Sequence, residues 1–288
     1  MRAELVSVPT ETEPLDGLWC LPEPGPAKGA ALIMHGNQGN FYVGPPRFLP
    51  PALAEIGLAS FAYNRRGHDI LATYRGRQPV GGALQLTEEA IADNHHAAEF
   101  VSGRGFTTQV VIGHSNGGLL AARHVADHPD ALALVLLSAA GGGADANRIN
   151  SHQGLLLRDR YEELTAAARR MLEDGRGDEL MLMPGWWWLI TPRSLLDRAE
   201  ALPDLVGLAP SIRCPTLFLK GVDEPEAAYP ARAFAAACGG VCEVAEVEGL
   251  DHWYTGRDGE VAATVAGWLE RTLGLIPADP GRRGGLDG

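Results

Sequence analysis

The sequence predicts an α/β fold in which a mostly parallel sheet carries helices on both faces and is interrupted by a helical insertion. Apolar β-branched runs alternate with segments of helical spacing across the first 140 residues, as in strands joined by right-handed helical crossovers. The run 30–34 is apolar throughout, as expected of a parallel strand covered on both sides. Strand-like runs then stop at residue 144 and resume at residue 215, and this gap is the insertion.

Composition favours one large enzyme-sized domain over other classes of protein. The chain has 288 residues, 45% of them hydrophobic, which suffices for a sizeable core. Its formal charge of −12 argues against nucleic acid or an anionic membrane as partner, because such binding depends on Lys and Arg. We expect a small-molecule substrate as the partner, and the sequence gives no indication of the oligomeric state.

The ends and the cysteines favour a cytoplasmic protein. Residues 1–5 lack the apolar part of a secretory signal, and no apolar run approaches the length of a membrane span. The four cysteines form no Cys-x-x-Cys pair. We therefore expect free thiols and neither disulfides nor a metal site.

The first half of the chain is expected to contain an opening hairpin followed by alternating strands and helices. The expected strands are 4–8, 15–21, 30–34, 58–63, 110–112 and 132–137, and the expected helices are 46–56 and 88–103. Residues 70–85 have the composition of a loop.

The second half is expected to contain the insertion and then the end of the sheet. Three helices are expected in the insertion, at 161–173, 179–190 and 194–201, and then strands 215–220 and 241–247 with helices 229–237 and 259–273. The resulting division is a core of residues 1–143 and 211–276, a helical lid of residues 144–210, and a disordered Gly/Arg/Asp-rich tail of residues 277–288.

A Gly-x-Ser-x-Gly sequence at residues 113–117 stands between the strand-like run 110–112 and the helix-like run 119–123. A serine on such a turn projects its hydroxyl above the sheet, and the flanking glycines remove Cβ atoms that would collide there. The start of the helix adds N–H groups suited to an oxyanion. Ser115 is therefore the candidate nucleophile, although the same motif also occurs as an ordinary turn.

A serine hydroxyl needs a base and a group that orients the base. His252 is the best candidate base, because it lies between the last expected strand and the last helix, in a loop at the carboxyl edge of the sheet where ligand sites form. The other internal histidines are assigned packing, turn or solvent roles: His35, His95, His96, His114, His124 and His128.

The orienting carboxylate should follow the strand that ends at Lys220. Asp223 and Glu224 both lie there, and only one can face His252. We favour Asp223 because Asp is the commoner residue in this role. Glu224 is the alternative, because it stands three residues after a glycine and directly before a proline.

An oxyanion hole needs two preorganised donors. The backbone N–H of Asn116 is the first, and the loop after His35 can supply the second from Asn37 or Gln38. The glycines of this loop are not followed by Gly-Lys-Ser/Thr, and no Gly-x-Gly-x-x-Gly opens a helix. We therefore expect no nucleotide cofactor.

The order of nucleophile, acid and base, with a His-Gly turn upstream, resembles the α/β-hydrolase superfamily over nearly the whole chain except the tail. Residues 35–42 and 64–69 further resemble one branch of these hydrolases. The resemblance implies a cofactor-free acyl transfer from an ester, thioester, lactone or amide to Ser115 and then to water. The ambiguous acid is the main departure from the pattern.

Trp186, Trp187 and Trp188 are adjacent in an expected helix of the insertion. Successive helical residues project about 100° apart, so the three indoles cannot share one buried face. We expect them to line an apolar pocket between lid and sheet, with Phe41 and Tyr42 beside it, or else to pack the lid on the sheet. Three polar residues at the end of a strand could receive a substrate carboxylate, although turn roles are favoured: Arg65, Arg66 and His68.

The leading hypothesis is a serine hydrolase acting on a small, largely apolar substrate. The same triad could also cleave a C–C bond or transfer an acyl group, because fold and triad do not fix the reaction. A non-catalytic binding protein is the third hypothesis, and it leaves the complete set of nucleophile, base and acid without a purpose.

Overall fold

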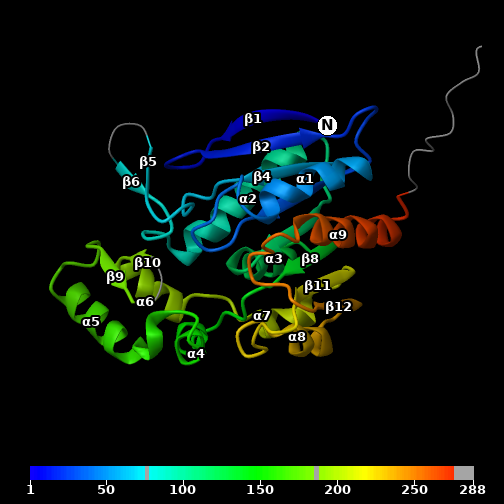
Figure 1. Ribbon diagram of the computed structural model, residues 1–288. Helices are drawn as coiled ribbons and strands as arrows, with labels where there is room; N and C mark the ends of the chain where they lie inside the picture. Colours follow the sequence, from blue (N-terminus) through cyan, green and yellow to red (C-terminus); the bar gives the residue numbers. More distant parts are fainter. Residues whose placement is uncertain (75–77, 185–187, 276–288) are drawn as a thin grey trace, which may run out of the picture.

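The computed structural model describes residues 1–74, 78–184 and 188–275, and its centre is an eight-stranded sheet (Figure 1). The strand order is β1-β2-β4-β3-β7-β8-β11-β12. Strand β2 runs antiparallel to β1 and β4. The six strands that end this order, β4, β3, β7, β8, β11 and β12, run parallel to one another. The strands are β1 (Arg2–Val8), β2 (Leu15–Leu21), β3 (Gly29–Met34), β4 (Leu58–Tyr63), β7 (Val110–His114), β8 (Ala133–Leu137), β11 (Thr216–Gly221) and β12 (Cys242–Val247).

Helices cover both faces of this sheet, which confirms the predicted fold class. One face packs against α1 (Pro45–Glu55) and α9 (Asp258–Leu273). The other packs against α2 (Thr87–Gly103), α3 (Asn116–Asp127), α7 (Leu205–Leu208) and α8 (Ala231–Ala237). Every residue of the five strands β3, β4, β7, β8 and β11 is buried, as continuous apolar runs between two helical layers should be.

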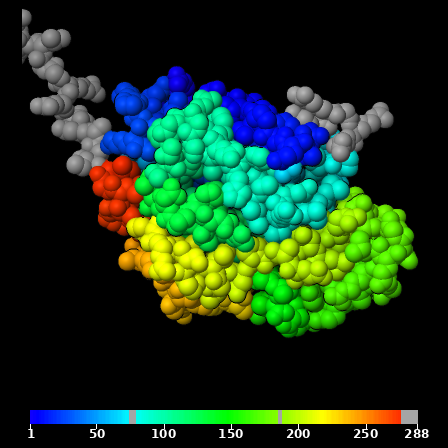
Figure 2. Space-filling model, turned by 180° about the vertical axis from the view of Figure 1, so that it is seen from behind, coloured from blue at the N-terminus to red at the C-terminus, as the bar shows by residue number. Residues whose placement is uncertain are grey.

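The last part of the stretch 144–210, from Leu205 onward, packs on the sheet. The rest of the stretch forms a lobe at one end of the molecule, green to yellow-green in Figure 2. Its apolar side chains make a small cluster of their own, which includes Leu164, Trp188 and Leu195. The elements of this stretch are α4 (Ala146–His152), η1 (Leu157–Asp159), α5 (Tyr161–Glu173), β9 (Met181–Met183), β10 (Trp188–Ile190), α6 (Pro192–Glu200) and α7, with η2 (Ala209–Ser211) at its end.

Two of the secondary-structure assignments made from the sequence are wrong. The expected helix at 179–190 is the antiparallel pair β9–β10, in which Trp188 lies opposite Met183. Alternate residues of β10 are buried, which is the period of a strand, and Pro184 is incompatible with a helix interior. The expected loop at 70–85 contains a second short pair, β5 (Ala72–Tyr74) and β6 (Gln78–Val80). The expected disordered tail, 277–288, lies outside the described residues.

Within the described residues, no helix combines the length and apolar character that a membrane crossing requires.

Candidate active site

Ser115 sits on a strained turn between β7 and α3. Its φ of 56° and ψ of −122° are unusual for a residue with a side chain. A Cβ on Gly113 would lie 2.2 Å from the Gly117 carbonyl oxygen, and a Cβ on Gly117 would lie 2.3 Å from that of His35. Glycine is therefore required at both positions, and the close packing of β7, α3 and the end of β3 holds the serine hydroxyl above the sheet.

His252 lies within hydrogen-bonding distance of the serine hydroxyl. Its Nε2 is 3.1 Å from Ser115 Oγ, and its Nδ1 is 2.7 Å from Glu224 Oε1. The three side chains follow β7, β12 and β11, whose carboxyl ends meet at one edge of the sheet. This is the serine–imidazole–carboxylate geometry that lets an imidazole remove the serine proton.

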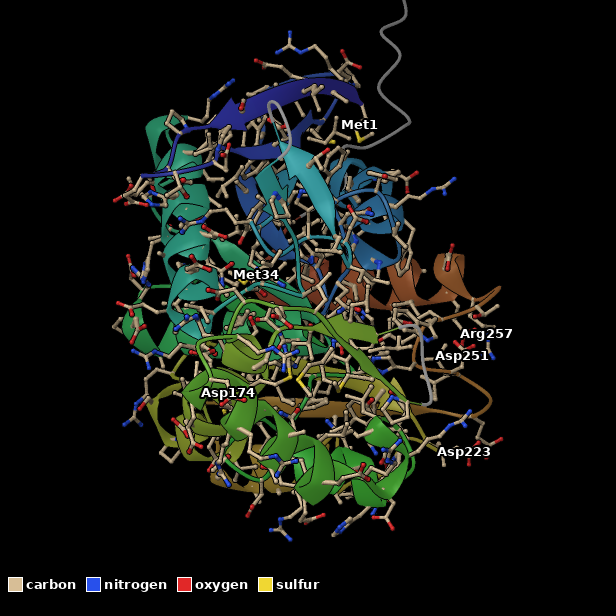
Figure 3. The ribbon with its side chains drawn as sticks, turned by 90° about the vertical axis from the view of Figure 1, so that its left-hand side faces the viewer. Met1, Met34, Asp174, Asp223, Asp251 and Arg257 are labelled. Carbon is tan, nitrogen blue, oxygen red and sulfur yellow. The ribbon has the colours of Figure 1, made fainter. Side chains whose placement is uncertain are left out.

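The structure pairs Glu224, and not the favoured Asp223, with His252. Residues 221–224 form a turn in which the Glu224 N–H donates to the Gly221 carbonyl at 3.2 Å. Lys220, which is 2% exposed, donates to the Glu224 carbonyl at 2.8 Å. The last residue of the turn therefore points inward, whereas Asp223 at its apex is exposed at the edge of the molecule (Figure 3).

The second oxygen of Glu224 is held by two donors. Oε2 accepts from the Ser138 hydroxyl at 2.6 Å and from the Gly221 N–H at 2.8 Å. Ser138 in turn accepts from the Tyr254 hydroxyl at 2.9 Å. The carboxylate is thus fixed with Oε1 facing His252.

His114, to which sequence reasoning gave only a packing role, holds the loop that carries the base. Its Nε2–H donates to the His252 carbonyl at 2.8 Å. Burial, and secondarily the charge of His252, lower the pKa of His114 to about 3. The neutral imidazole of His114 therefore holds the backbone of His252 in place by this hydrogen bond. In the sequence, the feature that pointed to this role was the position of His114 directly before Ser115.

The loop after β3 approaches the nucleophile, as the predicted oxyanion hole requires. Gly36, Asn37 and Asn116 all line the cavity beside Ser115. The first N–H groups of a helix have no partner within that helix, which leaves the Asn116 N–H available at the start of α3. The Gln38 side chain instead donates to the Leu189 carbonyl at 3.2 Å, so of the two alternatives Asn37 lies nearer the cavity.

A buried arginine fixes this loop. Arg65 is fully buried and donates to the His35 carbonyl at 2.8 Å, while its own N–H donates to His35 Nε2 at 3.1 Å. Burial, and then the charge of Arg65, hold the pKa of His35 well below its usual range. Both residues therefore shape the turn, which is the role that the sequence analysis favoured for them.

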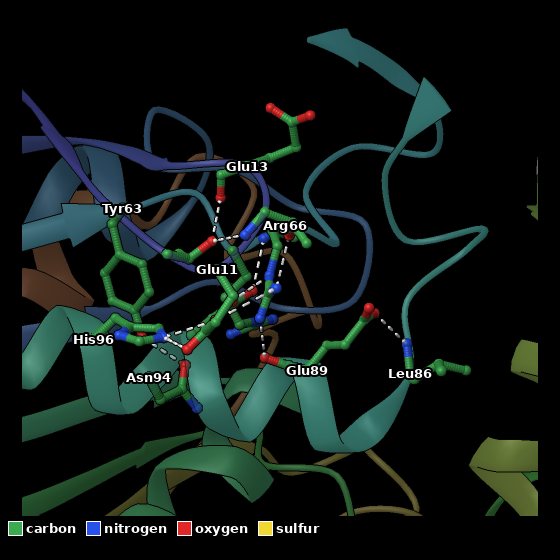
Figure 4. Close-up of polar contacts among 12 residues, drawn as sticks. Glu11, Glu13, Tyr63, Arg66, Leu86, Glu89, Asn94 and His96 are labelled. Atoms are coloured by element: carbon green, nitrogen blue, oxygen red, sulfur yellow. Dashed lines mark hydrogen bonds and ion pairs between the residues drawn. The ribbon is translucent and has the colours of Figure 1, made fainter. Parts of the chain in front are cut away.

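Arg66 and His68 are also engaged within the protein. Arg66 Nε donates to Asp93 at 2.7 Å, in the polar network around α2 that Figure 4 shows. His68 Nδ1 is 2.7 Å from Asp69. These contacts support turn roles over binding of a substrate carboxylate.

A cavity of about 300 Å³ opens beside Ser115. Its wall is mixed in character, with Ala140, Leu155, Leu156, Tyr229 and Trp253 among the apolar and aromatic residues and Asn37, Asn150 and Arg198 among the polar ones. Burial lowers the pKa of Arg198 to about 10, so the guanidinium remains charged at neutral pH. It donates to Asn37 Oδ1 at 3.1 Å, and its Nε is buried without a partner among the described residues.

Of the five aromatic residues expected to line this cavity, the three that the structure describes lie elsewhere. Trp188 is 1% exposed and packs in the apolar cluster of residues 144–210, with the Arg198 guanidinium 5.8 Å from its ring. Phe41 packs on the core beside α1, and Tyr42 is 56% exposed. None of these three lines the cavity. Trp186 and Trp187 lie outside the described residues.

Comparison with protein families decides the family. The model of the family described as serine aminopeptidase, S33, matches residues 25–256, which include all three members of the site. The chain belongs to this family. Together with the sheet topology, this match makes the protein an α/β-hydrolase enzyme. No curated protein matches the chain.

Solved structures share this hydrolase fold at low sequence identity. Est1E from Butyrivibrio proteoclasticus, with ferulic acid bound, aligns with a TM-score of 0.68 at 19% identity, over 93% of this chain and 99% of that one. A thermostable carboxyl esterase from Bacillus coagulans aligns with a TM-score of 0.71 at 14% identity, over 95% and 99%. The esterase domain of a Rhodothermus marinus protein aligns with a TM-score of 0.64 at 19% identity, over 94% and 99%.

Proposed function

We propose that this hydrolase cleaves an ester, thioester or lactone of a small substrate through an acyl-enzyme on Ser115. The observation that carries the proposal is the unbroken hydrogen-bonded series from Ser115 Oγ through His252 to Glu224, beside a cavity large enough for a small substrate. The esterases among the structures of similar fold are consistent with this choice.

In the acylation half, His252 Nε2 removes the Ser115 proton as Oγ attacks the substrate carbonyl carbon. The carbonyl π electrons move to oxygen, and the N–H groups of Asn116 and Asn37 stabilise the oxyanion. When the carbonyl reforms, the bond to the alkoxide breaks, and His252 donates the proton to the leaving alcohol. Glu224 holds the tautomer of His252 and stabilises its cationic form.

In the deacylation half, water takes the place of the alcohol. His252 removes a proton from water as its oxygen attacks the acyl carbon, and Ser115 recovers the proton when the second tetrahedral intermediate collapses. The products are a carboxylic acid and an alcohol, and the enzyme returns to its starting state.

The charge of the cavity favours an ester over the free amino end of a peptide. Among the described residues the lining contains the guanidinium of Arg198 and no carboxylate. A substrate ammonium group would therefore meet a like charge and no counter-ion. The wall suits an apolar acyl chain against Leu155 and Leu156, and Arg198 offers a counter-ion to an anionic group of the substrate.

Labelling by a fluorophosphonate probe tests the nucleophile directly. We expect stoichiometric labelling of the peptide that contains Ser115, and hydrolysis of p-nitrophenyl butyrate by the wild type. Ser115→Ala should abolish labelling and lower kcat by at least about 10³-fold, because a triad member is lost. Ser7→Ala, at an exposed position of β1, is the matched control. Labelling that persists in Ser115→Ala would refute the assignment.

A further inference from the structure

Three histidines gather away from the active site, where α2 packs beside α3. The two helices form adjoining teal and green parts of the surface in Figure 2. His95 belongs to α2, and His124 and His128 lie four residues apart at the end of α3. One ring nitrogen from each lies within 4.8 Å of those of the other two. Together with Glu99 and other residues, the three line a cavity of about 260 Å³.

His124 has a ring nitrogen that needs a partner. The residue is 6% exposed, and its Nδ1 is buried without a hydrogen-bond partner among the described residues. A buried polar atom left unpaired costs free energy. A bound ligand at this nitrogen would remove that cost.

The tautomer of His128 is the one that a metal ligand needs. Its Nδ1–H donates to the His124 carbonyl at 2.9 Å, which fixes the tautomer and leaves the Nε2 lone pair free to coordinate. Metal-bound histidines commonly make such a bond through their second nitrogen.

The surrounding charges favour a cation. Glu99 stands four residues after His95, so the two share one face of α2, and both line the cavity. Asp130 is also in the wall. The carboxyl end of α3 adds the negative end of its dipole.

We propose that His95, His124 and His128 form a binding site for a divalent transition metal, with Zn²⁺ as the best match to three imidazoles. Tetrahedral zinc–nitrogen bonds of 2.0–2.1 Å place ligand nitrogens about 3.4 Å apart. The rings of His124 and His128 are stacked with their centroids 4.2 Å apart, so they rotate out of this stack when the three nitrogens converge on one ion. Glu99 or water completes the coordination. His124 is nine positions after Ser115, or roughly 13 Å along the helix. The metal therefore joins α2 to α3 at a distance from the reacting atoms.

Zinc binding to the full chain, purified without a histidine tag and freed of metal by a chelator, tests the site. We expect one Zn²⁺ per chain by calorimetry, with a Kd below about 10 µM, and a rise in Tm on its addition. His128→Gln and His95→Gln should each weaken binding by at least about 10-fold. The matched control is His96→Gln, because that neighbouring ring contacts Glu11 instead.

Co²⁺ provides a second measurement with the same variants. The wild type should show the intense visible bands of a tetrahedral site, and His128→Gln and His95→Gln should lose them. The proposal fails if the wild type binds no Zn²⁺, or if the two variants bind it as tightly as His96→Gln does. Ester hydrolysis enters neither measurement, so the outcome is independent of the proposed function.

Discussion

The two carboxylate oxygens of Glu224 have different partners, and this arrangement suits the side chain to orient a base. One oxygen faces His252, while the other is held by Ser138 and Gly221. A carboxylate that is held at one end cannot rotate away from the imidazole. The proposed role of Glu224 therefore depends on its charge and on its fixed position.

Exchange of the two neighbouring acids for their amides separates their roles. We predict that Glu224→Gln lowers kcat on p-nitrophenyl butyrate by about 10³- to 10⁴-fold, because the amide favours the wrong tautomer of His252. Asp223→Asn should stay within about twofold of the wild type, since an exposed change away from the site costs little. Steady-state measurements of kcat for both purified variants test this prediction. A larger loss of kcat in Asp223→Asn than in Glu224→Gln would assign the role to Asp223.

From the sequence we select two of the three side chains that the structure brings together, Ser115 and His252, but favour Asp223 over Glu224 for the third. Ser115 and His252 are each fixed by one local pattern, a glycine-flanked turn and a loop after the last strand. Asp223 and Glu224 are adjacent, so local pattern cannot separate them. The direction of Glu224 depends on the buried ammonium of Lys220 and on Ser138 from β8's end, and such contacts between distant segments are absent from a linear pattern.

At the level of elements, α6 links residues 144–210 to the reaction. Arg198, near the carboxyl end of this helix, reaches the cavity and binds Asn37 of the proposed oxyanion loop. Arg193 on the same helix binds the exposed Asp178 instead. One helix therefore presents one arginine to the cavity and another to the exposed surface.

This arrangement predicts a charge preference in the acyl group. Arg198→Met should lower kcat/KM for the p-nitrophenyl monoester of glutarate by about 10-fold more than for p-nitrophenyl valerate, the equivalent of roughly 1.4 kcal/mol from one partly buried ion pair. Arg193→Met is the control and should change neither ester. Equal losses on the two esters would mean that Arg198 acts only through Asn37.

Long elements were predictable and short pairs were not. The buried strands β3, β7 and β11 and the long helices α2, α5 and α9 follow their apolar spacing closely. The pair β9–β10 gains its stability from Trp188 and Met183 packing in a local cluster. Three-residue strands have too few positions to establish a period, so contacts outside the segment decide their conformation.

For the whole molecule, the two neutral histidines at the ends of β3 and β7 couple folding to pH. Burial is the main cause that lowers the pKa values of His35 and His114 in the folded state, whereas an unfolded histidine titrates near 6.5. The unfolded chain therefore binds more protons below about pH 6.5. Stability contributed by the neutral rings is full above that pH and is lost as the pH falls toward the folded pKa, which for His114 is about 3.

We predict that the free energy of unfolding falls by on the order of 1 kcal/mol per buried neutral histidine between pH 7.5 and 5.5. Urea denaturation at these two pH values, in the presence of a chelator, measures the change. His114→Gln keeps a donor for the His252 carbonyl but cannot titrate. The fall in its free energy of unfolding between the two pH values should therefore be smaller than that of the wild type by about 1 kcal/mol. A pH dependence identical to that of the wild type would contradict this explanation.

The three members of the site follow different strands, and His252 follows β12, an edge strand that pairs with β11 alone among the described strands. Ser115 and His252 are 137 positions apart in the chain. Strand β11, on which β12 pairs, itself pairs with β8 across the whole stretch 138–215. Pairing over such a separation forms slowly, because its loop entropy is spent before its contacts are made. During synthesis Ser115 therefore emerges more than a hundred residues before His252, its proposed base. In the proposed mechanism the serine becomes reactive only when the last part of the sheet has formed.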